Sequence, residues 1–253
     1  MTENKIELSA GYASQQEVQA YQELVLLMQE TPIPPREILG NLSLYLSRSA
    51  LSQILFIHEL YKRIIEIHGV IFEFGVRWGR NLSMYSVLRA IYEPYNDSRK
   101  IVGFDTFEGF PSVAIEDGAS ESASVGRLAV TKGYEEYLEK VLATHEKLAP
   151  RSHLRKHEIV KGDVVNTLPR YLEDNPETIV AMAYFDFDIY KPTLKCLQAL
   201  RDRFTRGAVV AFDELALHEY PGETKAVMEA LGLGNIRLQR LPFSGYRSFF
   251  VVE

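Results

Sequence analysis

The chain has 253 residues, of which 46% are hydrophobic and 25% charged, an ordinary balance for a folded domain. Its net charge of −6 argues against a general nucleic-acid-binding protein, because such proteins present a basic surface. The single cysteine, Cys196, excludes an internal disulfide and suits a reducing compartment. No apolar run has the length of a membrane span, and the first nine residues show no signal sequence. We therefore expect a cytoplasmic protein that binds neither nucleic acid nor membrane.

Residues 1–48 mix polar helix-forming residues with a proline-rich turn. The pattern predicts a helix over 15–29 that ends before the prolines at 32, 34 and 35, because proline removes a backbone donor and clashes with the preceding turn. We expect this helical extension to serve as a lid or as a contact in a homo-oligomer. A single domain is predicted over 49–253.

Beyond a helical pattern over 49–68, short apolar runs alternate with helical patterns, which is typical of a parallel sheet with helices on both faces. The last two strands are joined by a turn too short for a crossover and must pair antiparallel. We thus predict an α/β fold with a central seven-stranded, mostly parallel sheet and a C-terminal hairpin. The expected elements are strand 70–74, helix 80–92, strand 100–104, helix 134–145, strand 158–161, helix 164–172, strand 178–185, helix 192–204 closed by Gly207, strand 208–212, helix 223–231, and strands 236–241 and 246–252.

Residues 111–133 are small, polar and glycine-containing, with little periodicity. Long loops without secondary structure inside compact domains are usually functional or mobile. We predict a mobile cover near the active edge of the sheet. A plain surface insertion is the alternative that the sequence leaves open.

The predicted strand 70–74 leads into Gly75 and Gly79, and a helix follows. This arrangement lets a cofactor approach bare backbone and a helix N-terminus. Ligands of open α/β sheets bind beyond the carboxyl ends of the strands, so the residues at those ends are a functional test. Acidic residues stand at five of them: Glu73, Asp105, Asp163, Asp186 with Asp188, and Asp213 with Glu214. The preference of Asp for turns and helix caps accounts for one or two of these.

Two of these acids are placed to hold a nucleoside. Asp105 ends the second strand, where a carboxylate can accept hydrogen bonds from both hydroxyls of a ribose; a loop cap is the alternative. Asp163 follows Gly162 and is placed to meet an adenine amino group; a helix N-cap is the alternative.

The remaining acids predict a metal site. Asp186 and Asp188 point to one face of extended chain, and Asp213 and Glu214 end the next strand. Converging carboxylates repel one another unless a positive charge joins them, and oxygen-rich sites suit Mg²⁺ or a similar cation. A basic partner such as Arg247 is the competing explanation, but it leaves the clustering at strand ends unexplained.

Several motifs resemble a known family. They are Phe72-Glu-Phe-Gly-Val-Arg-Trp-Gly-Arg-Asn-Leu-Ser, Gly103-Phe-Asp-Thr-Phe-Glu-Gly-Phe-Pro, Gly162-Asp with Thr167-Leu-Pro, and Phe185-Asp-Phe-Asp-Ile-Tyr followed by Val210-Ala-Phe-Asp-Glu. With them, residues 49–253 resemble the macrocin O-methyltransferase (TylF) family of metal-dependent sugar O-methyltransferases. The resemblance implies the class I methyltransferase, Rossmann-like fold, for which the C-terminal hairpin is a signature. It also implies that S-adenosyl-L-methionine is the methyl donor.

The resemblance also implies roles for individual residues. Asp188 is expected to be the general base, and Mg²⁺ or another divalent cation is expected on Asp186, Asp213 and Glu214. The family usually has a second Asp where this chain has Glu214. The donor is expected to contact Glu73, Gly75, Gly79, Asp105, Thr106, Gly162, Asp163 and Asp186.

The acceptor implied by the resemblance is a sugar hydroxyl of a nucleotide sugar or a glycoside. Two other functions remain open at this point. One is a metal-dependent O-methyltransferase of a catechol or another small hydroxylated metabolite. The other is a dinucleotide-binding oxidoreductase or a nucleotide-binding module, against which the C-terminal hairpin and the acidic cluster argue.

Overall fold

A computed structural model describes residues 13–120 and 123–253. The predicted extension 1–48 and the predicted cover 111–133 therefore lie partly outside the described residues. The chain divides after Ile54 into two compact units. No helix in the described parts is long and apolar enough to cross a membrane.

The first unit contains α1 (Gln15–Gln29), α2 (Pro35–Ile38), η1 (Leu39–Tyr45) and the first turns of α3 (Arg48–Ile64). The predicted helix 15–29 is confirmed. It begins there because Ser14 and Glu17 form a capping box: the Glu17 N–H donates to Ser14 Oγ at 3.2 Å, and the Ser14 N–H donates to Glu17 Oε2 at 2.8 Å. None of the residues in α1, α2 and η1 is buried.

The second unit is built on a sheet with the strand order β3-β2-β1-β4-β5-β6. Five neighbouring strands are parallel, and β6 pairs antiparallel with β5. The strand order reverses between β1 and β4, and in open α/β sheets ligands bind beyond the carboxyl ends of the strands at such a point. The strands are β1 (Val70–Phe74), β2 (Ile101–Asp105), β3 (His157–Lys161), β4 (Val180–Phe185), β5 (Phe204–Phe212) and β6 (Ser248–Val251).

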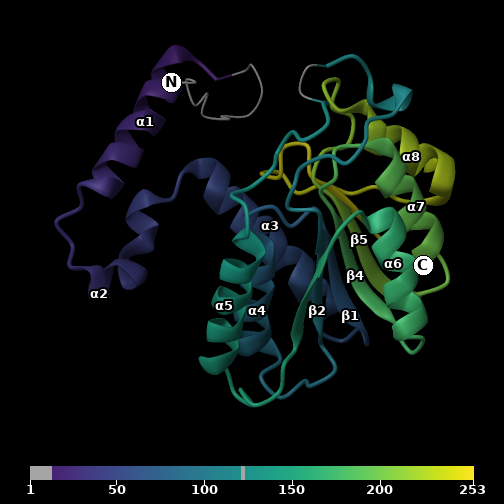
Figure 1. Cartoon of the computed structure of the whole chain (residues 1–253), viewed down its shortest axis with the longest axis horizontal. Coiled ribbons are helices and arrows are strands. Elements are labelled where there is room, and N and C mark those ends of the chain that lie inside the picture. Colours follow the sequence, from purple (N-terminus) through teal and green to yellow (C-terminus); the bar gives the residue numbers. More distant parts are fainter. Residues whose placement is uncertain (1–12, 121–122) are drawn as a thin grey trace. The chain divides into compact units, whose positions relative to one another are not determined.

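Helices cover both faces of this sheet (Figure 1). Successive strand residues point to opposite faces, so Ile71 packs under one layer and Phe72 under the other. The two layers account for the two hydrophobic cores. The first layer comprises the second half of α3, α4 (Arg80–Tyr92) and α5 (Tyr134–Lys147); the second comprises α6 (Val164–Asp174), α7 (Tyr190–Leu200) and α8 (Pro221–Leu231). Short 3₁₀ turns occur at η2 (Ile115–Asp117) and η3 (Leu233–Asn235).

The predicted α/β class I methyltransferase fold is confirmed, with two corrections in the described residues. The sheet has six strands, not seven: the predicted strand 236–241 contributes only a bridge between Gln239 and Phe249. Beyond this bridge, the Leu241 N–H donates to Ser244 Oγ and the Ser244 hydroxyl donates to Leu241 O, so the backbone of Leu241 bonds within the turn. Gly207 does not close a helix but lies within β5, where a Cβ would approach Ile67 Cδ1 to 2.5 Å.

A buried ion pair braces the amino ends of the strands. Arg99 is 1% exposed, and its guanidinium donates to Glu93, to Gly69 O at 2.5 Å and to Ile64 O at 2.8 Å. Tyr61 donates its hydroxyl proton to Glu93 at 2.6 Å. Arg99 therefore joins the end of α3 to the start of β1, at the opposite end of the strands from Asp186 and Asp213.

We predict that Arg99→Met destabilises the protein. The change removes the bonds to the backbone and leaves the Glu93 carboxylate buried without its cation, which costs about 3–5 kcal/mol. Equilibrium urea unfolding measures the loss. Arg170→Met is the matched control, because the Arg170–Asp174 pair is exposed and contributes little. Equal stability losses in the two variants would contradict the assignment.

Candidate active site

The hydrogen-bond ladder of the sheet continues into the residues that the sequence singled out. Beyond the strand ends, the Gly75 N–H donates to Phe104 O at 3.0 Å and the Asp186 N–H donates to Phe74 O at 2.8 Å. The Asp213 N–H in turn donates to Phe185 O at 2.9 Å. These predicted site residues are therefore positioned by hydrogen bonds to the central strands of the sheet.

Gly75 brings the loop after β1 into contact with the end of β4. Its φ is +85°, and a Cβ at this position would lie 1.9 Å from the carbonyl oxygen of Asp186. Only glycine fits both conditions. Gly79, at φ +73°, is the N-cap residue of α4, and no side chain caps that helix. The first N–H groups of α4 are thus available to a ligand.

Asp105 holds two loops together. Its Oδ2 accepts from Arg77 N at 2.7 Å and its Oδ1 from Phe107 N at 2.5 Å. Both donors have left-handed backbone, with φ of 48° and 58°. Burial raises the pKa of Asp105. The loop-cap role left open by the sequence is present, and the neighbouring Thr106 hydroxyl shapes the same turn by donating to Gly109 O at 2.7 Å.

Asp163 also adopts the alternative left open by the sequence. It is the N-cap of α6, and its Oδ1 accepts from Val165 N at 3.0 Å. Gly162 precedes it at φ +133°, and its N–H donates to Asp105 O at 2.9 Å. The contact with adenine stays a prediction.

The acids after β4 and β5 form a cluster in which Asp188 is buried and Asp186, Asp213 and Glu214 are partly buried. Burial, followed by the charges of Asp213 and Asp188, raises the pKa of Asp186 well above its ordinary value. Asp188 is 7% exposed and has left-handed backbone, at φ 62°. Residues held in such sparsely populated conformations are frequent at active sites.

One acid of the cluster has the basic partner that the sequence left as the competing explanation. Arg247 Nε donates to Asp213 Oδ1 at 2.8 Å, and the Tyr184 hydroxyl donates to the same oxygen. Arg247 therefore neutralises part of the charge after β5.

Sequence reasoning missed Glu223. It lies in the first turn of α8, is fully buried, and its Oε2 accepts from Glu214 N at 3.3 Å. Burial, then the nearby charges of Asp188 and Asp213, raise its pKa. An acid in the first turn of a helix ordinarily indicates only a favourable helix dipole. The available signal was its place soon after the Asp213-Glu214 strand end.

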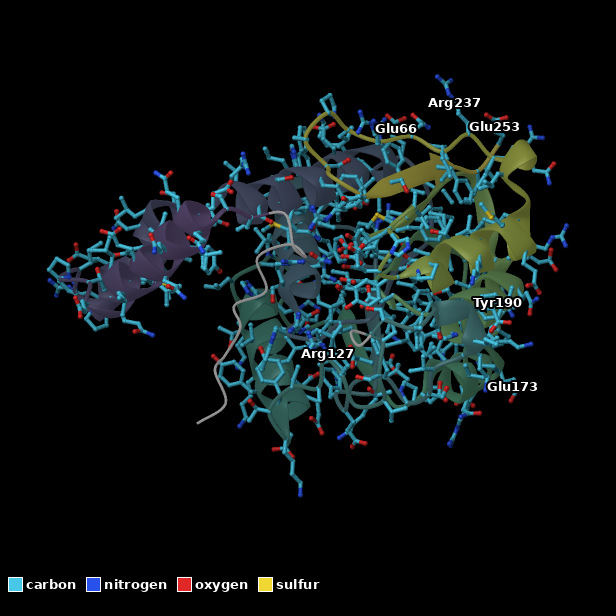
Figure 2. All side chains as sticks on the ribbon, turned by 90° about the horizontal axis from the view of Figure 1, so that it is seen from above. Glu66, Arg127, Glu173, Tyr190, Arg237 and Glu253 are labelled. Carbon is cyan, nitrogen blue, oxygen red and sulfur yellow. The ribbon has the colours of Figure 1, made fainter. Side chains whose placement is uncertain are left out.

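Asp117 was missed as well. Its Oδ1 accepts from Tyr190 N at 2.6 Å and its Oδ2 from Ala114 N at 2.7 Å. Tyr190, labelled in Figure 2, begins α7 two residues after Asp188. Lys225 of α8 donates to Glu116 O at 2.8 Å. The described start of the predicted cover, around η2, is thus fastened beside the acidic cluster.

The carboxylates have the chemistry of cation ligands, but their side chains do not form a coordination group. Within 13–120 and 123–253, no group of three or more His, Cys, Asp or Glu side chains is arranged to hold a metal ion. The donor set is nevertheless all oxygen, as Mg²⁺ requires. Glu223 Oε1 is buried without a hydrogen-bond partner. The donor set and this unpartnered oxygen thus fit a hard divalent cation in their chemistry.

Comparisons with known proteins agree with this architecture. The family model described as Macrocin-O-methyltransferase (TylF) matches residues 53–230. The crystal structure of CalS11, Calicheamicin Methyltransferase, is 43% identical, covers 95% of this chain and 94% of its own, and superposes with a TM-score of 0.93. The apo structure of CalS11, TDP-rhamnose 3′-O-methyltransferase, is 39% identical, covers 95% and 96%, and has a TM-score of 0.85.

A more distant match shows the fold alone. The O-methyltransferase NovP is 19% identical, covers 80% of each chain and has a TM-score of 0.61. A search of curated proteins found no match. The family model covers more than half of the chain, and the structures at 43% and 39% identity span nearly all of it. The chain therefore belongs to the macrocin O-methyltransferase (TylF) family and is an O-methyltransferase.

Proposed function

We propose that this enzyme transfers a methyl group from S-adenosyl-L-methionine to a hydroxyl of a nucleotide-linked sugar. The observation that carries the proposal is the contact between Gly75 and Asp186, because it joins the donor loop to the acidic cluster. The sugar class is supported by the CalS11 structure described as a TDP-rhamnose 3′-O-methyltransferase, which covers 95% of this chain at 39% identity.

The donor would lie along the loop after β1. Gly75 and Gly79 shape this loop, and the uncapped start of α4 would supply N–H groups to the donor. Asp105 holds this loop in place, and each of its carboxylate oxygens keeps acceptor capacity for a ribose hydroxyl beyond its bond to the backbone. Gly162 and Asp163 would approach the adenine from the end of β3.

Asp188 would act as the general base. An alcohol is a poor nucleophile at neutral pH, so its proton must leave as the oxygen attacks the methyl carbon. The C–O bond forms, the C–S bond of the sulfonium breaks to give S-adenosylhomocysteine, and the proton passes to the Asp188 carboxylate. The left-handed backbone of Asp188 fixes where that carboxylate is presented. Alignment of oxygen, methyl carbon and sulfur lowers the barrier further.

A divalent cation such as Mg²⁺ would be held by Asp186, Asp213 and Glu214. When bound, it would stabilise the negative charge that develops on the attacking oxygen. Its charge would also offset the repulsion among these buried carboxylates.

The acceptor class is tested directly. We expect methyl transfer from S-adenosyl-L-methionine to a TDP-linked deoxysugar, because a related enzyme of nearly the same length is described as acting on one. Mass spectrometry of products after incubation with TDP-rhamnose, a rhamnoside and a catechol, each with and without Mg²⁺, measures it. Methylation of the catechol alone would contradict the sugar class.

We predict that Asp188→Asn lowers kcat by about 10²–10⁴-fold, since the amide cannot accept the proton. Calorimetry should show the affinity for S-adenosylhomocysteine nearly unchanged, because Asp188 is proposed to act on the acceptor. If the variant retained most of the wild-type kcat, another base would have to be sought.

We predict that Asp105→Asn raises the Kd for S-adenosylhomocysteine by about tenfold, as expected when one charge-assisted hydrogen bond to the loop is lost. Calorimetric titration measures the change. Asp174→Asn, an exposed position at the end of α6, is the matched control. A Kd equal to that of the control would remove Asp105 from the donor site.

A further inference from the structure

The side chain of Glu223 has an unusual environment. Its exposed fraction is 0%, and its Oε1 makes no hydrogen bond. None of the ion pairs in the described parts of the chain includes it. Its charged neighbours are instead the acids Asp188, Asp213 and Glu214. A buried carboxylate among like charges is strongly unfavourable unless it takes up a proton or a cation compensates it.

The fold holds Glu223 in this position firmly. Pro221 begins α8, and a Cβ on Gly222 would lie 2.0 Å from Asp117 Oδ1 and 2.7 Å from Tyr190 N. The first turn of α8 is therefore packed directly on the segment that follows Asp188. The Thr224 hydroxyl also accepts from Ala216 N at 2.9 Å, which ties the same turn to the loop after β5.

Roles other than metal binding explain these contacts poorly. Glu223 does not cap its own helix: its one backbone hydrogen bond is with Glu214 N. A bond to a sugar hydroxyl would require surface exposure, which Glu223 lacks. A small cation can enter where a sugar cannot, and Asp213 Oδ1 already accepts from both Arg247 and Tyr184. Glu223 Oε1, which has no hydrogen-bond partner, is thus available as a ligand near Asp213, whose Oδ1 is already engaged.

We propose that Glu223 is a ligand of the divalent cation, in addition to Asp186, Asp213 and Glu214. The inference rests on the proposed function, because it assumes that this enzyme uses such a cation. Glu223 Oε1 would coordinate the ion, while Oε2 keeps its bond with the Glu214 N–H and so fixes the neighbouring ligand. The cation would supply the charge that the buried acids lack.

The test measures metal binding without turnover. Full-length protein freed of metal by EDTA and dialysis is titrated with Mn²⁺ alone, and free Mn²⁺ is followed by electron paramagnetic resonance. We expect one site in the wild type and a Kd raised by about tenfold or more in Glu223→Gln, as found when groups that hold or orient metal ligands are altered. Glu229→Gln is the control: Glu229 lies on the same helix, but its carboxylate accepts from the Tyr190 hydroxyl. The Mn²⁺ Kd of Glu229→Gln should stay within about twofold of the wild type, because the Glu229 carboxylate bonds to Tyr190 and not to a proposed metal ligand.

Two further measurements separate metal binding from folding. The Tm of metal-free Glu223→Gln should not fall below that of the wild type, because the variant removes one of several like charges. Addition of Mg²⁺ should raise the Tm of the wild type and of Glu229→Gln, but not that of Glu223→Gln. Glu223→Asp, which keeps the charge on a shorter side chain, should bind Mn²⁺ with intermediate affinity.

The outcomes distinguish the two proposals. Wild-type Mn²⁺ affinity in a folded Glu223→Gln would overturn the role of Glu223 and leave the cation in place. A wild type that binds no Mn²⁺ would overturn both the cation and this inference, while methyl transfer to the nucleotide sugar would remain testable by itself.

Discussion

The repulsion among buried carboxylates at the carboxyl edge of β4 and β5 is the constraint on which the site depends. Asp186, Asp188, Asp213 and Glu223 lie near one another, and the pKa of Asp186 is raised by burial and by its acidic neighbours. A fold selected for stability alone would not gather these charges. Arg247 donates to Asp213 and offsets part of this charge. The proposed divalent cation would offset the charge that remains.

Buried ion pairs stabilise the opposite end of the sheet, where the strands begin. There the buried charges are matched: Arg99 pairs with Glu93, and Arg89 pairs with Glu146 at 3.2 Å. His157, the first residue of β3, also contacts Glu146 at 3.0 Å. Arg89 and Arg99 also bond to several backbone carbonyls, so they fix the chain at the amino ends of the strands. Buried charges are thus paired at the amino ends of the strands, whereas acids gather at their carboxyl ends.

Much of this arrangement could be predicted from the sequence because it depends on local patterns. The bounds of α1, β1 and α4 follow from apolar spacing, proline and glycine, and the acids at the strand ends are read directly. Gly207 could not be placed correctly, because its close approach to Ile67 is a tertiary contact. Asp117 was missed for the same reason, because its carboxylate bonds to Tyr190, 73 residues later. The signal for Glu223 was its place soon after the Asp213-Glu214 strand end, and its burial is a tertiary feature that no local pattern shows.

The segment from Asp186 to Tyr190 shows how donor and acceptor positions are coupled. At its start, the Asp186 N–H bonds to β1 and its carbonyl leaves no room for a Cβ on Gly75. At its end, the Tyr190 N–H bonds to Asp117 of the predicted cover. Asp188 lies between these anchors in left-handed backbone, a conformation that persists only when its surroundings enforce it. The donor loop and the cover therefore hold the proposed base from opposite sides, so a shift in either would move its carboxylate relative to the reacting hydroxyl.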